Sequence, residues 1–99
     1  MIEMLVGLQV TNEADYAKYR EGMTPILESI GGGFGYDFKV SKVLKSESPN
    51  PINRVFTISF PDKNAMDLFF ADEKYLKIKE QFFTKSVGST TIISTYNKF

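Results

Sequence analysis

In the N-terminal third of the chain, the spacing of apolar residues changes from every second position to the three- and four-residue spacing of a helix. Apolar side chains occupy every second position at the start, which predicts a strand buried on one face: Ile2, Met4, Val6, Leu8 and Val10. Asn12, three residues before an aspartate, then predicts the N-cap of a helix. The helical pattern runs to Ile30, and Pro25 inside it predicts a kink or a short restart near Met23.

A run of three glycines, Gly31–Gly33, follows the helical pattern. Glycine adopts left-handed backbone angles at little cost, so the run predicts a helix C-cap. A phosphate-binding glycine loop would need the order strand, glycine, helix, whereas here the glycines separate a helix from a strand. The run therefore indicates the end of a helix and not a phosphate site.

The middle of the chain is the most regularly alternating part. A second strand is predicted from Phe34 to about Leu44, with a bulge or bend at Val43–Leu44, because aromatic and apolar residues alternate there with small or charged ones. Residues 46–53, with two prolines, predict a loop. A third strand is expected from Arg54 to Phe60.

Two aspartates introduce the second helical region. Asp62 and Asp72 each occupy an N-cap position before apolar residues at helical spacing. Within it, Phe69 is expected to be buried against the apolar row of the first strand. The last segment, Val87 to Tyr96, is rich in Thr, Ile and Val and predicts a fourth strand.

The order strand, helix, strand, strand, helix, strand is that of the ferredoxin-like plan, in a single domain of residues 1–99 and the α+β class. Both helices are expected on one face of a four-stranded antiparallel sheet. The other face is predicted to carry a mixed set of side chains: Leu5, Gly7, Gln9, Asp37, Lys39, Val55, Thr57 and Ser59. Because this set is too apolar to be left exposed and too polar for a second core, we expect the face to pair with a second copy, as in a dimeric α/β barrel.

Composition excludes several function classes. Basic and acidic residues balance at 12 each, so nothing suggests a nucleic-acid partner. Cysteine and histidine are absent, which removes thiolate nucleophiles, the commonest metal ligands and the usual general base near neutral pH. The N-terminal segment carries Glu3 where a signal peptide would be basic, and no apolar run is long enough to span a bilayer. We therefore expect a cytoplasmic protein without membrane association, metal or cofactor.

Four short motifs together give the chain a family resemblance. They are Tyr16-Ala17-Lys18-Tyr19, Gly31-Gly32 with Phe34, Phe60-Pro61 followed by Ala65, Phe69 and Phe70, and Asp72-Glu73-Lys74-Tyr75. In order and spacing the chain resembles the domain-of-unknown-function family DUF1330, of the dimeric α/β-barrel superfamily. The resemblance implies a homodimer with a cavity but no agreed reaction. Two positions depart from the family pattern: Glu73-Lys74 replaces Pro-Glu, and Asp37 stands where relatives carry a basic residue.

Related barrels include haem-dependent and cofactor-free monooxygenases that rely on His, or on His and Trp beside Asn. This chain has neither residue type, so those mechanisms are closed to it. By elimination, a ligand site on the sheet face is predicted to use Gln9, Asp37, Lys39 and Arg54, with Asp37 as an acceptor or base. The alternative is that Asp37 and Lys39 form a solvated ion pair on an edge strand.

Other polar side chains have simpler interpretations. Tyr16, Tyr19 and Tyr75 are expected to bury their rings at core spacing, although their hydroxyls could also orient a ligand. Arg20 is assigned to the surface beside Glu21. The sequence thus predicts a small homodimer that binds a small organic molecule and that could transform it without a cofactor. The alternative is a non-catalytic structural or interaction module.

Overall fold

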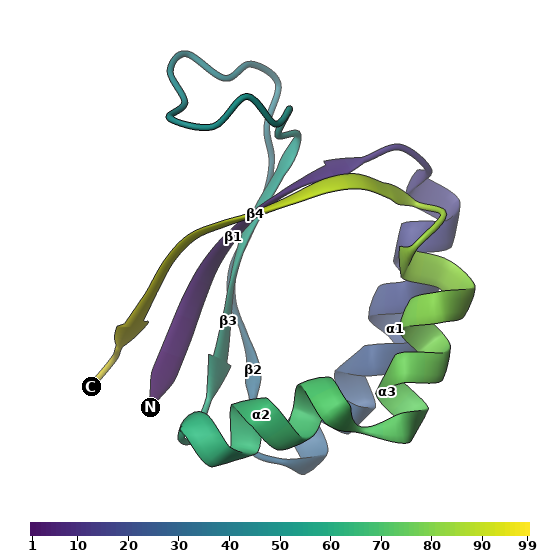
Figure 1. Ribbon diagram of the computed structural model, residues 1–99, viewed down its shortest axis with the longest axis vertical. Helices are drawn as coiled ribbons and strands as arrows, with labels where there is room; N and C mark the ends of the chain where they lie inside the picture. The colour runs from purple at the N-terminus through teal and green to yellow at the C-terminus, as the bar shows by residue number, and fades with distance from the viewer.

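The computed structural model describes all 99 residues, Met1–Phe99. Its elements follow the predicted order: β1 (Ile2–Val10), α1 (Glu13–Ser29), β2 (Gly33–Lys39), β3 (Arg54–Phe60), α2 (Lys63–Ala71), α3 (Glu73–Ile78), the π-helical turn η1 (Lys79–Phe83) and β4 (Val87–Asn97). The four antiparallel strands lie in the order β2-β3-β1-β4, and the helices cover one face of this sheet (Figure 1). The ferredoxin-like α+β fold is confirmed. None of the helices has the length and apolar character needed to cross a membrane.

The predicted helix ends are confirmed by their capping contacts. The side chains of Asn12, Asp62 and Asp72 each accept a hydrogen bond from the backbone N–H three residues later, at 3.1, 2.7 and 2.9 Å. Gly31 ends α1 with a φ of +83°, and its N–H donates to the carbonyl of Glu28. The glycine run is therefore a cap, as its position after a helix indicates.

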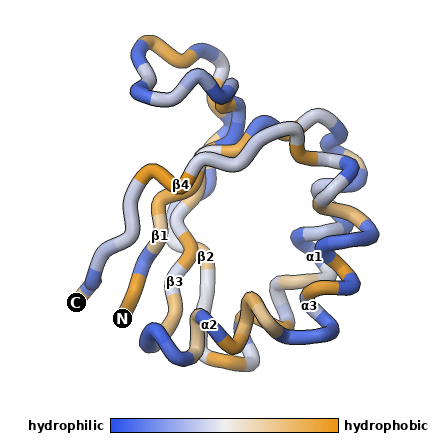
Figure 2. Tube along the Cα trace, in the orientation of Figure 1, coloured by the Kyte–Doolittle hydropathy of each residue, from blue (hydrophilic) through white to orange (hydrophobic).

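Two expectations about element bounds are wrong. Helix α1 continues through Pro25 without the predicted restart, and the Thr24 hydroxyl donates to the carbonyl of Arg20 one turn earlier. Strand β2 ends at Lys39 instead of near Leu44, and residues 40–53 form a loop that projects beyond the sheet. This loop carries an apolar stretch at Val43 and Leu44 (Figure 2), and Leu44 is 88% exposed.

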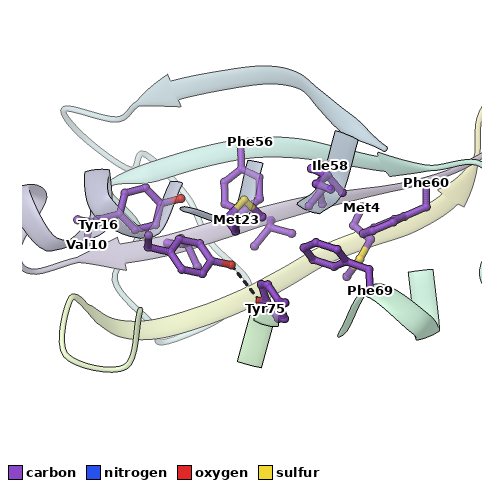
Figure 3. Close-up of a cluster of buried hydrophobic side chains, with 13 residues drawn as sticks. Met4, Val10, Tyr16, Met23, Phe56, Ile58, Phe60, Phe69 and Tyr75 are labelled. Carbon is purple, nitrogen blue, oxygen red and sulfur yellow. Dashed lines mark hydrogen bonds between the residues drawn. The ribbon is translucent and has the colours of Figure 1, made fainter. Parts of the chain in front are cut away.

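The core lies between the sheet and the helices. Alternate residues of β1 and β3 pack there against α1, α2 and α3 (Figure 3), in a cluster of Met4, Val6, Leu8, Val10, Tyr16, Tyr19, Met23, Leu27, Phe56, Ile58, Phe60, Phe69 and Tyr75. Phe69 is 1% exposed, with its ring centroid 4.4 Å from that of Tyr75 and 5.7 Å from that of Phe60. The predicted burial of Phe69 and the predicted inward row of β1 are thus confirmed.

A β-bulge in β2 changes which side chains face the helices. Phe34 lies opposite Ile58 and Asp37 opposite Phe56, so two residues, Gly35 and Tyr36, face the single residue Thr57. The Tyr36 N–H donates to Thr57 Oγ1 at 2.8 Å. A Cβ atom at position 35 would lie 2.6 Å from the same Oγ1, so only glycine fits the bulge without a shift. The predicted irregularity at Val43–Leu44 therefore occurs about eight residues earlier.

Candidate ligand-binding site

A cavity of about 270 Å³ lies between the sheet and the helices. Its walls are mainly apolar and come from all four strands and from α1, α2, α3 and η1. Five lining residues bring polar atoms: Tyr19, Arg20, Tyr75, Lys79 and Thr90. An apolar pocket with a few converging polar groups is the usual form of a small-molecule site.

A pair of tyrosine hydroxyls forms one polar group of the cavity. Tyr19 of α1 and Tyr75 of α3 are 6% and 3% exposed, and their hydroxyl oxygens are hydrogen-bonded at 2.9 Å, the dashed line beside Tyr75 in Figure 3. Burial raises the pKa of both hydroxyls above the ordinary value of 10.0. Both therefore keep their protons at neutral pH, so the pair retains one donor O–H for a ligand oxygen.

Arg20 forms the second polar group, held between aromatic rings. Its Cζ atom lies 3.9 Å from the ring centroid of Phe34 and 4.8 Å from that of Phe56. Its Nε donates to the hydroxyl of Tyr16 at 2.8 Å. Because its side chain is only 16% exposed, the assignment of Arg20 to the surface is wrong.

The charge beside Arg20 is set by an ion pair of β2 and β3. Arg54 donates from Nε and Nη2 to the two carboxylate oxygens of Asp37, at 2.7 and 2.8 Å. Asp37 Oδ1 also lies 3.2 Å from Arg20 Nη2. The Arg54 hydrogen bonds hold the pKa of Asp37 below its ordinary value of 3.8, so Asp37 is an occupied acceptor and a weak base.

The four residues of the sequence-predicted site do not converge. The bulge turns Asp37 to the helix side, where Arg54 already lies, so the expected placement of Asp37 on the opposite face is wrong. Lys39 is opposite Arg54 and exposed. Gln9 alternates with the buried Leu8 and Val10 and therefore faces away from the helices.

The sequence pattern of the residues that surround the cavity is also that of ordinary core packing. Tyr19 and Tyr75 occur at the spacing of core residues. That spacing is the same whether the buried tyrosine hydroxyl lies in the core or lines a cavity. Arg20 follows Tyr19 directly on α1, and neighbouring acidic residues made it resemble a surface position. The packing of Phe34 and Phe56 around the guanidinium shows that Arg20 is a cavity residue and not a surface one.

The face of the sheet away from the helices holds a buried carboxylate. Glu3 is 5% exposed, and its carboxylate accepts a hydrogen bond from the Tyr96 hydroxyl and lies 3.1 Å from Lys98 Nζ. The Tyr96 hydrogen bond lowers the pKa of Glu3. Towards the projecting loop the same face bears a hollow lined in part by Val43, Leu44, Ile52, Val55 and Ile93.

These features define a ferredoxin-like α+β protein with a cavity between sheet and helices. Residues 4–96 match the family described as "Domain of unknown function (DUF1330)", and the chain belongs to this family. None of the curated proteins is similar enough to this chain to count as a match.

Solved structures share the fold at low sequence identity. A protein of unknown function from Rhodopseudomonas palustris, RPA0582, superimposes with a TM-score of 0.80 at 18% identity, over 99% of this chain and 82% of that one. A putative antibiotic biosynthesis monooxygenase from Nitrosomonas europaea gives 0.64 at 12% identity, over 99% and 98%. A dimeric ferredoxin-like protein of unknown function from Jannaschia sp. CCS1 gives 0.60 at 13% identity, over 98% of each chain.

Proposed function

We propose that the protein binds a small organic molecule in the cavity between the sheet and the helices. The observation that carries this proposal is the 270 Å³ cavity with apolar walls, the Tyr19–Tyr75 hydroxyl pair and Arg20. At roughly 30 Å³ for each water molecule in the liquid, this volume corresponds to about nine waters.

Native mass spectrometry of freshly purified protein tests the proposal. We expect a retained small molecule, and we expect Ile92→Trp to reduce its occupancy, because Ile92 is 56% exposed and lines the cavity. Leu68→Trp is the matched control, since Leu68 is 61% exposed and does not line the cavity. If no molecule is retained and none from a library of small organic compounds shifts the unfolding temperature, a structural or interaction module becomes the better interpretation.

We also propose that the protein is a homodimer that pairs through the open face of the sheet. On that face the stacked rings of Tyr36 and Phe38 are 65% and 54% exposed, and Ile93 is 48% exposed. Apolar patches of this kind on a sheet usually mark an interface. The dimeric ferredoxin-like protein from Jannaschia supports the same arrangement. Light scattering at micromolar concentration tests it, and a monomer would contradict it.

A further inference from the structure

One guanidinium nitrogen beside the cavity is buried without a hydrogen bond. Arg20 Nη2 lies 3.2 Å from Asp37 Oδ1 in an ion pair, but the pair is not well enough directed to count as a full hydrogen bond. A poorly directed ion pair stabilises a guanidinium less than a two-pronged contact does, so Arg20 keeps the capacity to bind a better-placed carboxylate. Arg20 also lines the cavity, so an acceptor bound there would lie beside its guanidinium.

Arg20 shares its nearest carboxylate, Asp37, with a second arginine. Both oxygens of Asp37 are taken by the two-pronged contact with Arg54, the stronger geometry for such a pair. Two arginines thus share this carboxylate, and the only other acid in contact, Glu13, lies 3.8 Å from Arg54 and not beside Arg20. Arg20 therefore has no carboxylate of its own, and an anion bound in the cavity would supply one.

The rings around Arg20 determine what kind of anion fits. Phe34 and Phe56 hold the guanidinium, which favours a planar group that meets it edge to edge. Beyond the guanidinium the cavity walls are apolar, and the Tyr19–Tyr75 pair offers one hydroxyl donor. A phosphate would bring about two charges to a single buried cation, whereas a carboxylate brings one.

We infer that the ligand is a small monocarboxylic acid with an apolar aromatic or aliphatic body, and that Arg20 binds its carboxylate. This inference rests on the proposed function of the cavity. Asp37 is a positioning residue, which orients Arg20 and limits its affinity for anions. Lys79 is exposed and lines the same cavity, so it is the rival anchor that the experiment must separate from Arg20.

The test compares acids with their neutral amides by calorimetric titration near neutral pH. The probes are benzoate and benzamide, 3-phenylpropanoate and its amide, and cyclohexanecarboxylate and its amide. We expect at least one acid to bind about tenfold or more tightly than its amide. Arg20→Gln should reduce this preference to within about twofold, whereas the exposed Lys18→Gln on the same helix should retain it.

A second variant keeps the test valid if Arg20→Gln does not fold. Asp37→Asn removes the carboxylate that competes for Arg20, so it should strengthen binding of the acid about 3- to 10-fold and leave the amide unchanged. A purely structural role of Asp37 would weaken both probes alike, and that result would overturn the inference. The unfolding transition of each variant without ligand reports whether the fold is intact.

The remaining outcomes separate the inference from the function on which it rests. Equal binding of acid and amide would overturn the carboxylate assignment and leave the cavity as a binding site. Loss of the preference in Lys79→Gln, with retention in Arg20→Gln, would also overturn it. If no probe binds and purified protein retains no molecule, the proposed function fails and the inference with it.

Discussion

The two faces of the sheet are built in different ways. On the helix side, β1 places Met4, Val6, Leu8 and Val10 in one buried row, all at 9% exposure or less. From Ile2 to Leu8 the strand pairs with β3 without a break in register. Strict alternation therefore describes this pair of strands completely.

The open face depends on irregular strands. Strand β2 has the bulge at Gly35–Tyr36, and β4 shifts register beside Leu5 and again beside Gln9. The face combines the buried carboxylate of Glu3 with exposed aromatic rings, so it resembles neither a core nor an ordinary wet surface. The difference shows that regular strands position the apolar core, whereas the irregular edge strands decide where the charged groups lie.

The largest expected effect tests the regular side. Phe69→Ala should lower the free energy of unfolding by about 3–5 kcal/mol, because the ring is 1% exposed and packs against Phe60 and Tyr75. Denaturant titration measures this loss. Leu68→Ala is the matched control, and its effect should stay within about 0.5 kcal/mol because Leu68 is 61% exposed. A loss below about 1 kcal/mol for Phe69→Ala would contradict the position of the ring in the core.

The second prediction tests the open side. Val55→Asp should raise the dimer dissociation constant about tenfold or more, because Val55 lies on the open face beside Phe38 and would bring an unpaired charge into the proposed interface. Concentration-dependent light scattering measures the change. Leu76→Asp, on the exposed side of α3 at 44% exposure, should leave the dimer intact. Equal weakening by both variants would show that the open face is not the interface.

The same contrast explains what the sequence could predict. The element order and the caps at Asn12, Asp62 and Asp72 rest on local chemistry, and the structure confirms them. The inward row of β1 follows from its uninterrupted period of two. Helix α1 continued through Pro25 because the rest of its apolar stripe remains packed against the sheet.

The candidate site was less predictable because it depends on contacts between distant segments. The bulge that brings Asp37 to Arg54 requires the hydroxyl of Thr57, which lies 21 residues after Tyr36 in the chain. Nothing in the alternation of β2 reveals that partner. Arg20 likewise owes its buried position largely to rings on β2 and β3, which the pattern of its own helix does not reveal.

A smaller effect is expected at the polar part of the helix-covered side. Tyr19→Phe removes one partner of the 2.9 Å hydroxyl pair and should lower the free energy of unfolding by about 1 kcal/mol. Tyr75 lines the cavity, so water can satisfy its hydroxyl and limit the loss. Tyr36→Phe, at a residue 65% exposed, should have no measurable effect. A loss above about 3 kcal/mol would instead place Tyr75 in a site that water cannot reach.

The smallest effect is expected at the edge of the open face, and it depends on pH. The Tyr96 hydrogen bond lowers the folded-state pKa of Glu3 below its ordinary value of 4.5. Ionised Glu3 therefore adds stability above about pH 4.5, and this contribution is lost as the pH falls through the folded-state pKa.

Tyr96→Phe should be less stable than the wild type near neutral pH, and the difference in stability between the two proteins should shrink below pH 4.5. Tyr96 is 38% exposed, so solvent screening keeps this difference small. The pKa of Asp37 is also lowered, but Asp37 is present in both proteins and cancels in the comparison. Urea titrations across the acidic range measure the difference, and one that stayed constant down to about pH 2 would show that the hydroxyl does not act on the charge of Glu3.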